Sequence, residues 1–345
     1  MRQRPLVSII VPNYNHSRYL DECITSALNQ TYDNIEVIIL DNASEDDSVA
    51  IAMKYLGDKV RVCRNCYNIL NATYKVLITL AEGKYIMMLC ADDAIESTFV
   101  EKAVSIMEKY PEVGYVHGER DFINESGELM ELDPFFKCSF IAPGKAVMPI
   151  YMVTTIAHPS QGIFRAEVFK NIGGYDMEVD HMNADRMLWY YLSEVSDYAY
   201  IREKMCRIRI GNQTETFITQ RNFQHPILCH LTIKEMVRYA RQKSIENIIV
   251  REKEAYERLA KDFMNYVVGM LLVEDYECAG RYLDYIKILS DDVAESDEYI
   301  YLVGLQSKKE AIDRSKLDKF AVGAYQKKRG YEPPDGYIEL NLEEV

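Results

Sequence analysis

Three short polar clusters contain the residue types from which a chemical site could be built. Each follows an apolar run, and they read Pro12-Asn13-Tyr14-Asn15, Asp41-Asn42-Ala43-Ser44 and Cys90-Ala91-Asp92-Asp93. Together they supply an aromatic ring, acid and amide groups that form hydrogen bonds, and two adjacent carboxylates. This set suits a nucleoside diphosphate bound with a divalent cation, because carboxylates approach an anionic diphosphate only through a metal. Carboxylate and phosphate oxygens favour Mg²⁺ or Mn²⁺ over zinc.

The elements expected to position these clusters alternate between strand and helix. Residues 6–11 and 35–40 are β-branched and almost continuously apolar, as strands buried on both faces of a parallel sheet are. Apolar residues at helical spacing predict a helix over 17–30 between them. The alternation continues with helices at 46–56, 70–81 and 97–109 and strands at 59–63 and 84–89. Because the carboxyl ends of parallel strands meet at one edge of a sheet, the three clusters should share one crevice.

The pattern changes twice further along the chain. Between residues 113 and 165 the segments become shorter and contain four prolines, and beyond residue 226 the sequence looks helical throughout. The expected elements are helices at 165–172 and 184–194, a strand at 197–210, and helical stretches at 227–290 and 296–328. We therefore predict an α/β domain at 1–220, an all-helical region at 221–330, and a loosely held, acidic tail at 331–345.

The composition is that of an ordinary globular protein with a surplus of acids. The chain has 345 residues, with 40 Lys and Arg against 54 Asp and Glu, which gives a formal net charge of −14. No excess of cations is present to displace phosphate counterions, so a nucleic-acid partner is not expected. No apolar run reaches the roughly 18 residues that span a bilayer, and no signal peptide is visible at the start of the sequence. We expect a cytoplasmic protein, and an association with the inner face of the membrane stays open.

The eight cysteines do not form a recognisable disulfide or metal framework. They are spread over the whole chain, whereas disulfide frameworks occur in short, cysteine-dense secreted chains. Cys63 and Cys66 form the only CxxC pair, and no cysteine or histidine pair at comparable spacing completes a zinc site. We therefore expect reduced thiols.

Five sequence blocks, in matching order and spacing, resemble glycosyltransferase family 2. The blocks are VSIIVPNYN at 7–15, SALNQTY at 26–32, LDNAS at 40–44, AEGKY at 81–85 and ADD at 91–93. A weaker match continues from Phe164 to Asp185, so the resemblance covers roughly the first 210 residues. It implies a GT-A fold, a Rossmann-like α/β architecture whose mostly parallel sheet has helices on both faces, followed here by an all-helical C-terminal extension.

The resemblance also implies roles for the matching residues. The nucleotide would be held by Pro12, Asn13 and Tyr14, with Tyr14 stacking on the base, by Asp41 and Asn42 at the base edge, and by Asp92 near the ribose. Asp93 would ligate the metal that bridges both phosphates, where a Lewis acid stabilises the leaving diphosphate. Asp185 would be the general base that deprotonates the acceptor hydroxyl. Transfer would then proceed in one displacement, with inversion at the anomeric carbon.

Three positions depart from the family's pattern. Asn42 replaces the second of the two acids that contact the nucleobase in the family, and Cys90 replaces an acid before the metal motif. The Arg-Asn that commonly precedes the Ala-x-Gly block is Tyr74-Lys75 here, which leaves Lys75 as a substitute for a phosphate-facing arginine. Arg209, which follows the helix that carries the base, could supply the lost positive charge at the diphosphate.

Several assignments have competing interpretations. Asp185 opens a helix, where an acid is also favourable for purely structural reasons, and the nearby acids that rival it as base are Asp176, Glu178 and Asp180. His158 and Gln161 fall in the stretch expected to line the acceptor cleft. Trp189 is a further candidate for acceptor binding, although its place on an apolar helix face favours a position in the core.

The leading hypothesis is an inverting, metal-dependent glycosyltransferase of the hexosyltransferase type. It would move a sugar from a UDP-, GDP- or dTDP-sugar to a glycan or lipid-linked glycan, in polysaccharide or glycoconjugate biosynthesis. The alternative is a catalytically degenerate GT-A protein that binds a nucleotide or glycan. Nucleotidyltransferases and NAD-dependent enzymes are disfavoured because no glycine-rich phosphate loop follows the first predicted strand. The C-terminal helices could pack on the catalytic domain, form a homodimer or wall the acceptor site, and these roles stay open.

Overall fold

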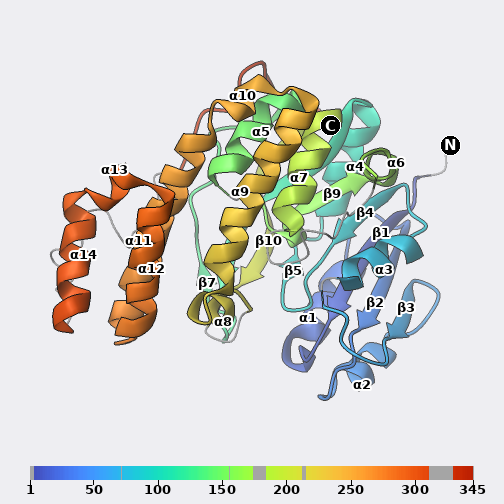
Figure 1. Ribbon diagram of the computed structural model, residues 1–345. Helices are drawn as coiled ribbons and strands as arrows, with labels where there is room; N and C mark the ends of the chain where they lie inside the picture. Colours follow the sequence, from blue (N-terminus) through green and yellow to red (C-terminus); the bar gives the residue numbers. More distant parts are fainter. Residues whose placement is uncertain are drawn as a thin grey trace. The chain divides into compact units, whose positions relative to one another are not determined.

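The computed structural model describes residues 4–70, 72–154, 156–173, 184–211, 215–310 and 329–344. The chain forms two compact units, each described separately below. The first comprises Met1–Met148, Thr155–Ile210 and Arg329–Val345, and the second comprises Pro149–Thr154 and Gly211–Lys328. Figure 1 labels the helices and strands along the chain. The rival bases Asp176, Glu178 and Asp180, and the helix expected up to residue 328 beyond residue 310, lie outside the described residues.

The first unit begins with four parallel strands in the order β3-β2-β1-β4. In chain order the elements are β1 (Val7–Asn13), α1 (Ser17–Leu28), β2 (Ile35–Asp41), α2 (Ser48–Met53), β3 (Val60–Arg64), α3 (Ala72–Leu80) and β4 (Tyr85–Met88). The strands β1, β2 and β4 are buried along almost their whole length, which is why their sequences are continuously apolar. The predicted elements of this half are confirmed, with ends shifted by at most three residues.

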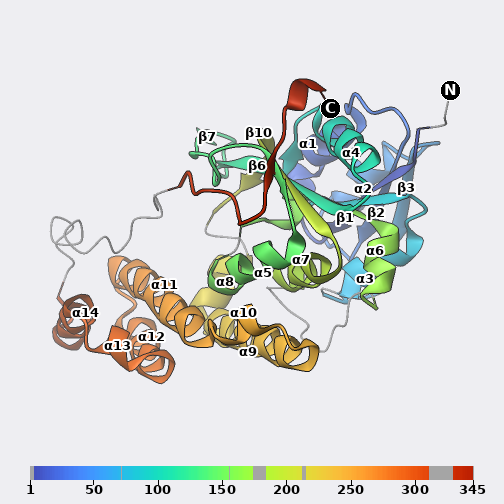
Figure 2. The same ribbon diagram turned by 90° about the horizontal axis from the view of Figure 1, so that it is seen from above.

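The second half of the sheet is mixed in direction. Its elements are β5 (Ala94–Ile95), α4 (Phe99–Lys109), β6 (Val113–Ile123), β7 (Leu129–Met130), β8 (Phe140–Ala142), the 3₁₀ turn η1 (Pro159–Gln161), β9 (Gly162–Arg165), α6 (Ala166–Asn171), α7 (Ala184–Val195) and β10 (Asp197–Arg209). The strand β9 runs antiparallel to both β4 and β6 and so joins the halves, while β10 is parallel to β6. Figure 2 shows α1 and α4 on one side of the sheet and α3 and α6 on the other.

The end of the chain is not the loosely held tail that the sequence predicted. The short strand β11 (Ile338–Glu339) pairs antiparallel with β8, and the 3₁₀ turn η3 (Leu342–Glu344) follows it. The Leu340 amide donates to the Ser139 carbonyl at 2.9 Å, and the Leu340 side chain is buried with the core of the first unit. This segment is ordered by pairing with the edge of β8, which lies about 200 residues earlier in the sequence. The composition of 331–345 alone gives no sign of that partner and therefore suggested disorder.

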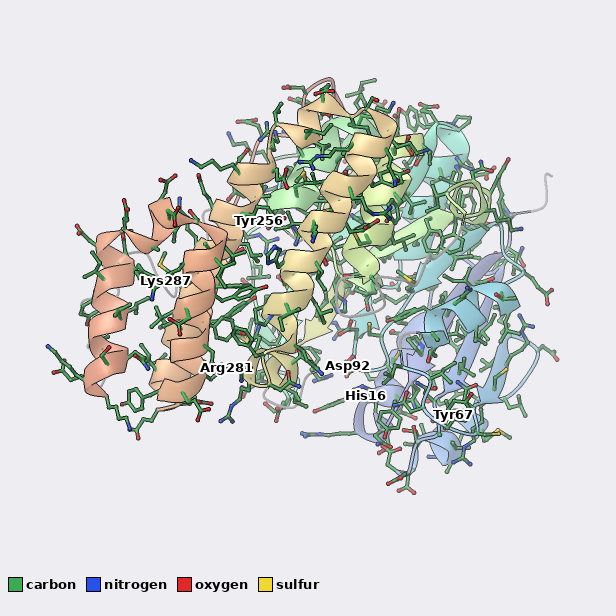
Figure 3. All side chains as sticks on the ribbon, in the orientation of Figure 1. His16, Tyr67, Asp92, Tyr256, Arg281 and Lys287 are labelled. Carbon is green, nitrogen blue, oxygen red and sulfur yellow. The ribbon has the colours of Figure 1, made fainter. Side chains whose placement is uncertain are left out.

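The second unit is helical in its described residues, as predicted. Its helices are α8 (Glu215–Arg221), α9 (Gln224–Lys243), α10 (Glu246–Ile249), α11 (Glu252–Leu272), α12 (Tyr276–Leu289), α13 (Asp291–Ala294) and α14 (Asp297–Lys308), and α5 (Gly144–Val153) ends in this unit. Aromatic rings of α11 and α12 pack together. Arg281, labelled in Figure 3, lies on α12, and its guanidinium is 4.4 Å from the ring centroid of Phe223. Among the described residues, no helix has the length and apolar character needed to cross a bilayer.

Candidate functional site

The first two polar clusters form one hydrogen-bonded corner at the ends of β1 and β2. Asn13 and Asp41 are the last residues of their strands and lie opposite each other in the parallel register. The Asn13 amide donates to Asp41 Oδ1 at 2.9 Å and to Ser44 Oγ at 3.2 Å, and the Ser44 backbone N–H donates to Asp41 Oδ2 at 3.0 Å. The corner fixes the loop that carries Tyr14, whose side chain is 43% exposed. Tyr14 is therefore available to a ligand, whereas Asn13 and Asp41 are buried.

The Asn42 side chain is committed to contacts within the protein. Its Oδ1 accepts from the Asn65 side chain at 2.9 Å and from the Ile69 backbone N–H at 3.0 Å, while its Nδ2 donates to Asn68 Oδ1. A carboxylate could not donate to Asn68. The departure from two acids is thus explained locally, because an amide at this position holds the 65–69 loop against β2.

The third cluster places Asp93 in a buried network and leaves Asp92 nearer the surface. Asp93 Oδ2 accepts from Ser160 Oγ at 2.6 Å and lies 3.3 Å from His158 Nδ1, and Asp93 Oδ1 accepts from the Arg209 backbone N–H at 2.9 Å. Burial, with the neighbouring Asp92 charge, raises the pKa of Asp93 well above its ordinary value. Asp92 is only partly buried, and no described residue donates a hydrogen bond to its carboxylate.

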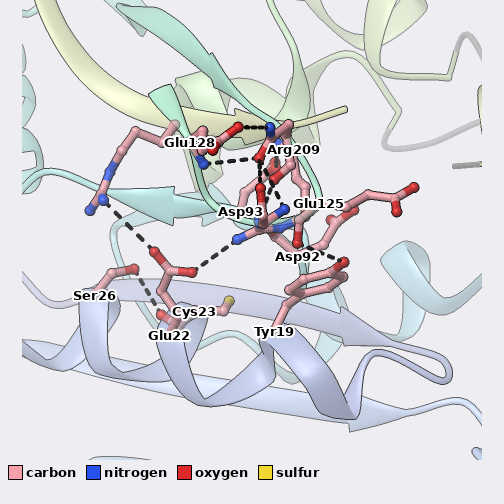
Figure 4. A network of polar contacts seen from close by, with 12 residues as sticks. Tyr19, Glu22, Cys23, Ser26, Asp92, Asp93, Glu125, Glu128 and Arg209 are labelled. Atoms are coloured by element: carbon pink, nitrogen blue, oxygen red, sulfur yellow. Dashed lines mark hydrogen bonds and ion pairs between the residues drawn. The ribbon is translucent and has the colours of Figure 1, made fainter. Parts of the chain in front are cut away.

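Arg209 fastens the end of β10 to this cluster (Figure 4). Its guanidinium donates to the carbonyls of Asp92 at 3.0 Å and Asn124 at 2.8 Å, pairs with Glu22 at 2.9 Å, and lies 4.0 Å from the ring centroid of Tyr19. The hydrogen-bonding capacity of Arg209 is thus largely used within the protein. Its expected role at the diphosphate stays a prediction, as does that of Lys75, which is exposed on α3.

One group of side chains around Asp93 has the spacing of a metal site. Single ligand atoms of Cys90, Asp93 and His158 lie within 4.8 Å of one another. Burial raises the pKa of the Cys90 thiol well above its ordinary value, and burial together with the Arg120 charge lowers the pKa of His158 to about 3. Both groups are therefore neutral at physiological pH.

The turn η1 links this group to the acceptor-side candidates. His158 and Gln161 form a reciprocal cap, in which Gln161 Oε1 accepts from the His158 backbone N–H at 2.8 Å and His158 Nδ1 accepts from the Ser160 backbone N–H at 3.4 Å. Gln161 is buried, and its amide also donates to the Gly118 carbonyl at 2.9 Å. Ser160, which holds Asp93, was not singled out from the sequence because a lone serine carries no signal without its partner 67 residues away.

Asp185 and Trp189 share α7 but differ in surroundings. Asp185 lies in the first turn, where burial raises its pKa to about 6 against the opposing effects of a backbone hydrogen bond and the charges of Arg186 and Arg120. Trp189 is fully buried and packs against the rings of Tyr115, His117 and Phe164. The acceptor-binding assignment of Trp189 is therefore wrong, because its ring has no exposed face to offer a sugar.

Comparison with known proteins identifies the family of this chain. Residues 8–173 match the model of Glycosyl transferase family 2. An uncharacterized glycosyltransferase of Rickettsia prowazekii is 30% identical over 224 residues, which are 63% of this chain and 68% of the relative. The chain belongs to glycosyltransferase family 2. This family 2 glycosyltransferase is also 28% identical over 231 residues to the chondroitin synthase of Escherichia coli, covering 65% of this chain and 32% of that protein.

Solved structures show the same fold at lower sequence identity. Residues 1–349 of S. aureus TarS, crystallised with UDP-GlcNAc, align with a TM-score of 0.58 and 16% identity over 88% of this chain and 92% of that one. The predicted fold class is thereby confirmed, including the helices that follow the mixed sheet.

Proposed function

We propose that this glycosyltransferase transfers a sugar, with inversion, from a nucleotide-sugar donor to an acceptor hydroxyl during polysaccharide or glycoconjugate assembly. The observation that carries the proposal is the corner in which Asn13, Asp41 and Ser44 hold the exposed Tyr14 ring at the carboxyl end of the sheet. A crevice at that edge is where open α/β sheets bind nucleotides. The UDP-GlcNAc complex of TarS supports a uridine nucleotide in the same fold.

We propose that the three polar clusters bind the nucleotide-sugar donor. Tyr14 stacks on the base beside Pro12 and Asn13, and Asp92 lies at the ribose and diphosphate side. Asp41 was expected at the base edge; because it is buried and both its oxygens are bonded, it contributes by fixing the corner that carries Tyr14. Asn42 contributes by shaping the 65–69 loop, since its own amide is already bonded. Lys75 and Arg209 are the cations proposed nearest the diphosphate.

The carboxylates fit a divalent cation unequally. Asp93 was the expected ligand, yet both its oxygens already accept hydrogen bonds from Ser160 and Arg209, whereas the Asp92 carboxylate accepts none from the described residues. Mn²⁺ or Mg²⁺ prefers carboxylate oxygens to the thiol and imidazole of Cys90 and His158. We propose that Asp92 holds the ion with Asp93 behind it, and that the ion, when bound, stabilises charge on the leaving diphosphate.

Asp185 is proposed as the general base. Its pKa of about 6 leaves it ionised at neutral pH yet basic enough to accept a proton from an acceptor hydroxyl as the new bond forms. A single displacement by that hydroxyl inverts the anomeric configuration and needs no covalent enzyme intermediate. A glycan or lipid-linked glycan is the proposed acceptor. Residues 1–220 are the proposed catalytic domain. For the helices of residues 221–330, formation of a homodimer is one of the roles that stay open.

A thermal-shift screen tests the donor proposal directly. UDP-, GDP- and dTDP-sugars would be added with and without Mn²⁺, and a donor at about 100 times its dissociation constant should add about 2.7 kcal/mol of stability. A matching shift without any release of nucleoside diphosphate would favour the degenerate binding protein instead. The absence of a shift with every donor would contradict both the enzyme and a degenerate nucleotide-binding protein, and would leave only a degenerate glycan-binding protein.

A further inference from the structure

Arg120, in β6, is a largely enclosed cation that no described carboxylate pairs with. Its guanidinium donates to Gln161 Oε1 and lies 5.4 Å from the ring centroid of Phe122, while its Nε is buried and has no hydrogen-bond partner. Burial lowers the pKa of Arg120 from its ordinary value, and the charge of the neighbouring Glu119 opposes this only in part. A charge removed from water without a counter-charge is costly, and proteins normally pair it.

The acids on either side of Arg120 are already paired with other cations. Glu119 is paired with Arg329, whose Nη2 lies 3.0 Å and 3.2 Å from the two carboxylate oxygens, and Asp121 is paired with Lys204 at 2.8 Å. Tyr200 Oη also donates to Glu119 at 2.6 Å. The Arg120 backbone N–H donates to Glu119 Oε1 at 2.8 Å, so this acid lies next to Arg120. Because Arg329 and Tyr200 occupy the Glu119 carboxylate, no side-chain bond between Glu119 and the Arg120 guanidinium is formed.

The face of β6 that carries Arg120 belongs to the acceptor side of the proposed site. The Arg120 guanidinium donates to Gln161, which caps His158, and the Arg120 charge lowers the pKa of both His158 and Asp185. Arg120 therefore lies within electrostatic range of each of them. Arg209, at the metal motif, is by contrast already bonded to Glu22 and to two carbonyls. Of these two arginines, only Arg120 has a buried guanidinium nitrogen, Nε, with no hydrogen-bond partner in the described protein.

We propose that Arg120 forms an anion subsite for the acceptor, where a carboxylate or phosphate group pairs with the guanidinium while a hydroxyl of the same molecule faces Asp185. The proposal rests on the proposed function of Asp185 and names the class of acceptor, an acidic glycan. Arg329 is a positioning residue in this arrangement. By compensating Glu119 it prevents that acid from drawing Arg120 away, so the C-terminal segment completes the subsite.

Ligand-observed NMR titrations test the subsite with four probes in protein saturated with UDP and Mg²⁺. The probes are methyl β-D-glucuronide, glucose 6-phosphate, inorganic phosphate and the neutral methyl β-D-glucoside, at matched ionic strength. We expect at least one of the two charged sugars to bind about tenfold more tightly than the neutral glycoside, as one charge-assisted contact allows. Comparing the two shows whether carboxylate or phosphate is preferred, and the phosphate arm shows how much the anion alone contributes.

Variants assign the preference to Arg120. Arg120→Met should abolish it while leaving the neutral probe unchanged, Arg120→Lys should keep part of it, and Arg202→Met, an exposed cation on β10, should keep all of it. Equal affinity for charged and neutral sugars in wild type, including no detectable binding of any, would overturn the proposal, as would anion binding that UDP displaces. The affinity for UDP is measured first in each protein. A protein that does not bind UDP would contradict the donor proposal, and this result is separate from the test of the anion subsite.

A second set of variants tests Arg329. Arg329→Met should reduce the preference about tenfold, because Glu119 then competes for Arg120, and Glu119→Gln in the same chain should restore it. A loss that the double variant does not restore, or no loss at all, would contradict the positioning role. Thermal unfolding of each variant, recorded in parallel, separates this effect from a general loss of folded protein.

Discussion

The substitution Asp185→Asn removes the carboxyl group that we propose as the general base. Burial raises the pKa of Asp185 from an ordinary value of 3.8 to about 6, and the effects of Arg186 and Arg120 only partly oppose this. At pH 8 the group is therefore ionised in surroundings that favour its neutral form. Activity and stability should consequently respond to this substitution in opposite directions.

The size of the stability effect follows from the shift. The folded-state pKa lies above the unfolded-state value, so the stabilising contribution of Asp185 is present below about pH 4 and is lost as pH rises through about 6. Two pKa units correspond to about 3 kcal/mol. Because the side chain is only partly buried, screening reduces the expected effect to about 1–2 kcal/mol. The variant should exceed wild type by that amount at pH 8 and match it below about pH 4.

Two assays test the prediction. Urea unfolding at pH 4, 6 and 8 gives the free energies, and the initial rate of nucleoside diphosphate release gives activity. The wild-type rate should fall about tenfold per pH unit below 6, and the variant should be about 10²–10⁴-fold slower at pH 7 and above.

The control is Asp197→Asn at the start of β10, where burial also raises the carboxyl pKa. It should leave the rate unchanged. An Asp185→Asn protein that is active, or no more stable than wild type at pH 8, would refute the reasoning.

Three further predictions concern residues whose surroundings the structure defines. Asp92→Asn should abolish the Mn²⁺-dependent part of the donor thermal shift at little cost in stability, whereas Asp93→Asn should lower the free energy of unfolding by about 1–3 kcal/mol because one buried donor loses its acceptor. Asn42→Asp should cost a similar amount, since two carboxyl or carbonyl oxygens would then face each other at Asn68. Trp189→Ala should cost about 3–5 kcal/mol in urea unfolding, and Trp189→Phe much less, because the ring fills core volume.

The sequence predicted the elements whose signals are local. The strands at 6–11 and 35–40 are buried on both faces, so their apolar runs reveal them directly, and the clusters that follow them meet as the parallel register requires. The two clusters that we propose for donor binding could therefore be found from order and spacing alone.

Contacts between distant parts of the chain could not be predicted in this way. Ser160 bonds Asp93 across 67 positions and Arg329 bonds Glu119 across 210, and neither residue type is distinctive in its own neighbourhood. The 331–345 segment was misjudged for the same reason, since its partner strand β8 provides the order that its own composition lacks. Trp189 is a different case. Its place on an apolar helix face favoured the core, as the structure shows, and acceptor binding stayed a candidate role only because a residue type suited to sugar stacking is equally suited to an aromatic core.

The central claim is that this chain transfers a sugar from a nucleotide-sugar donor. The most direct measurement is the release of UDP from UDP-GlcNAc with Mn²⁺, followed over time for wild type, Asp92→Asn and Asp185→Asn, with EDTA as a further control. We predict release by wild type that EDTA and Asp92→Asn abolish and that Asp185→Asn slows by about 10²–10⁴-fold. Release that none of these changes affects, or no release from UDP-, GDP- or dTDP-sugars by the wild-type protein, would contradict the account.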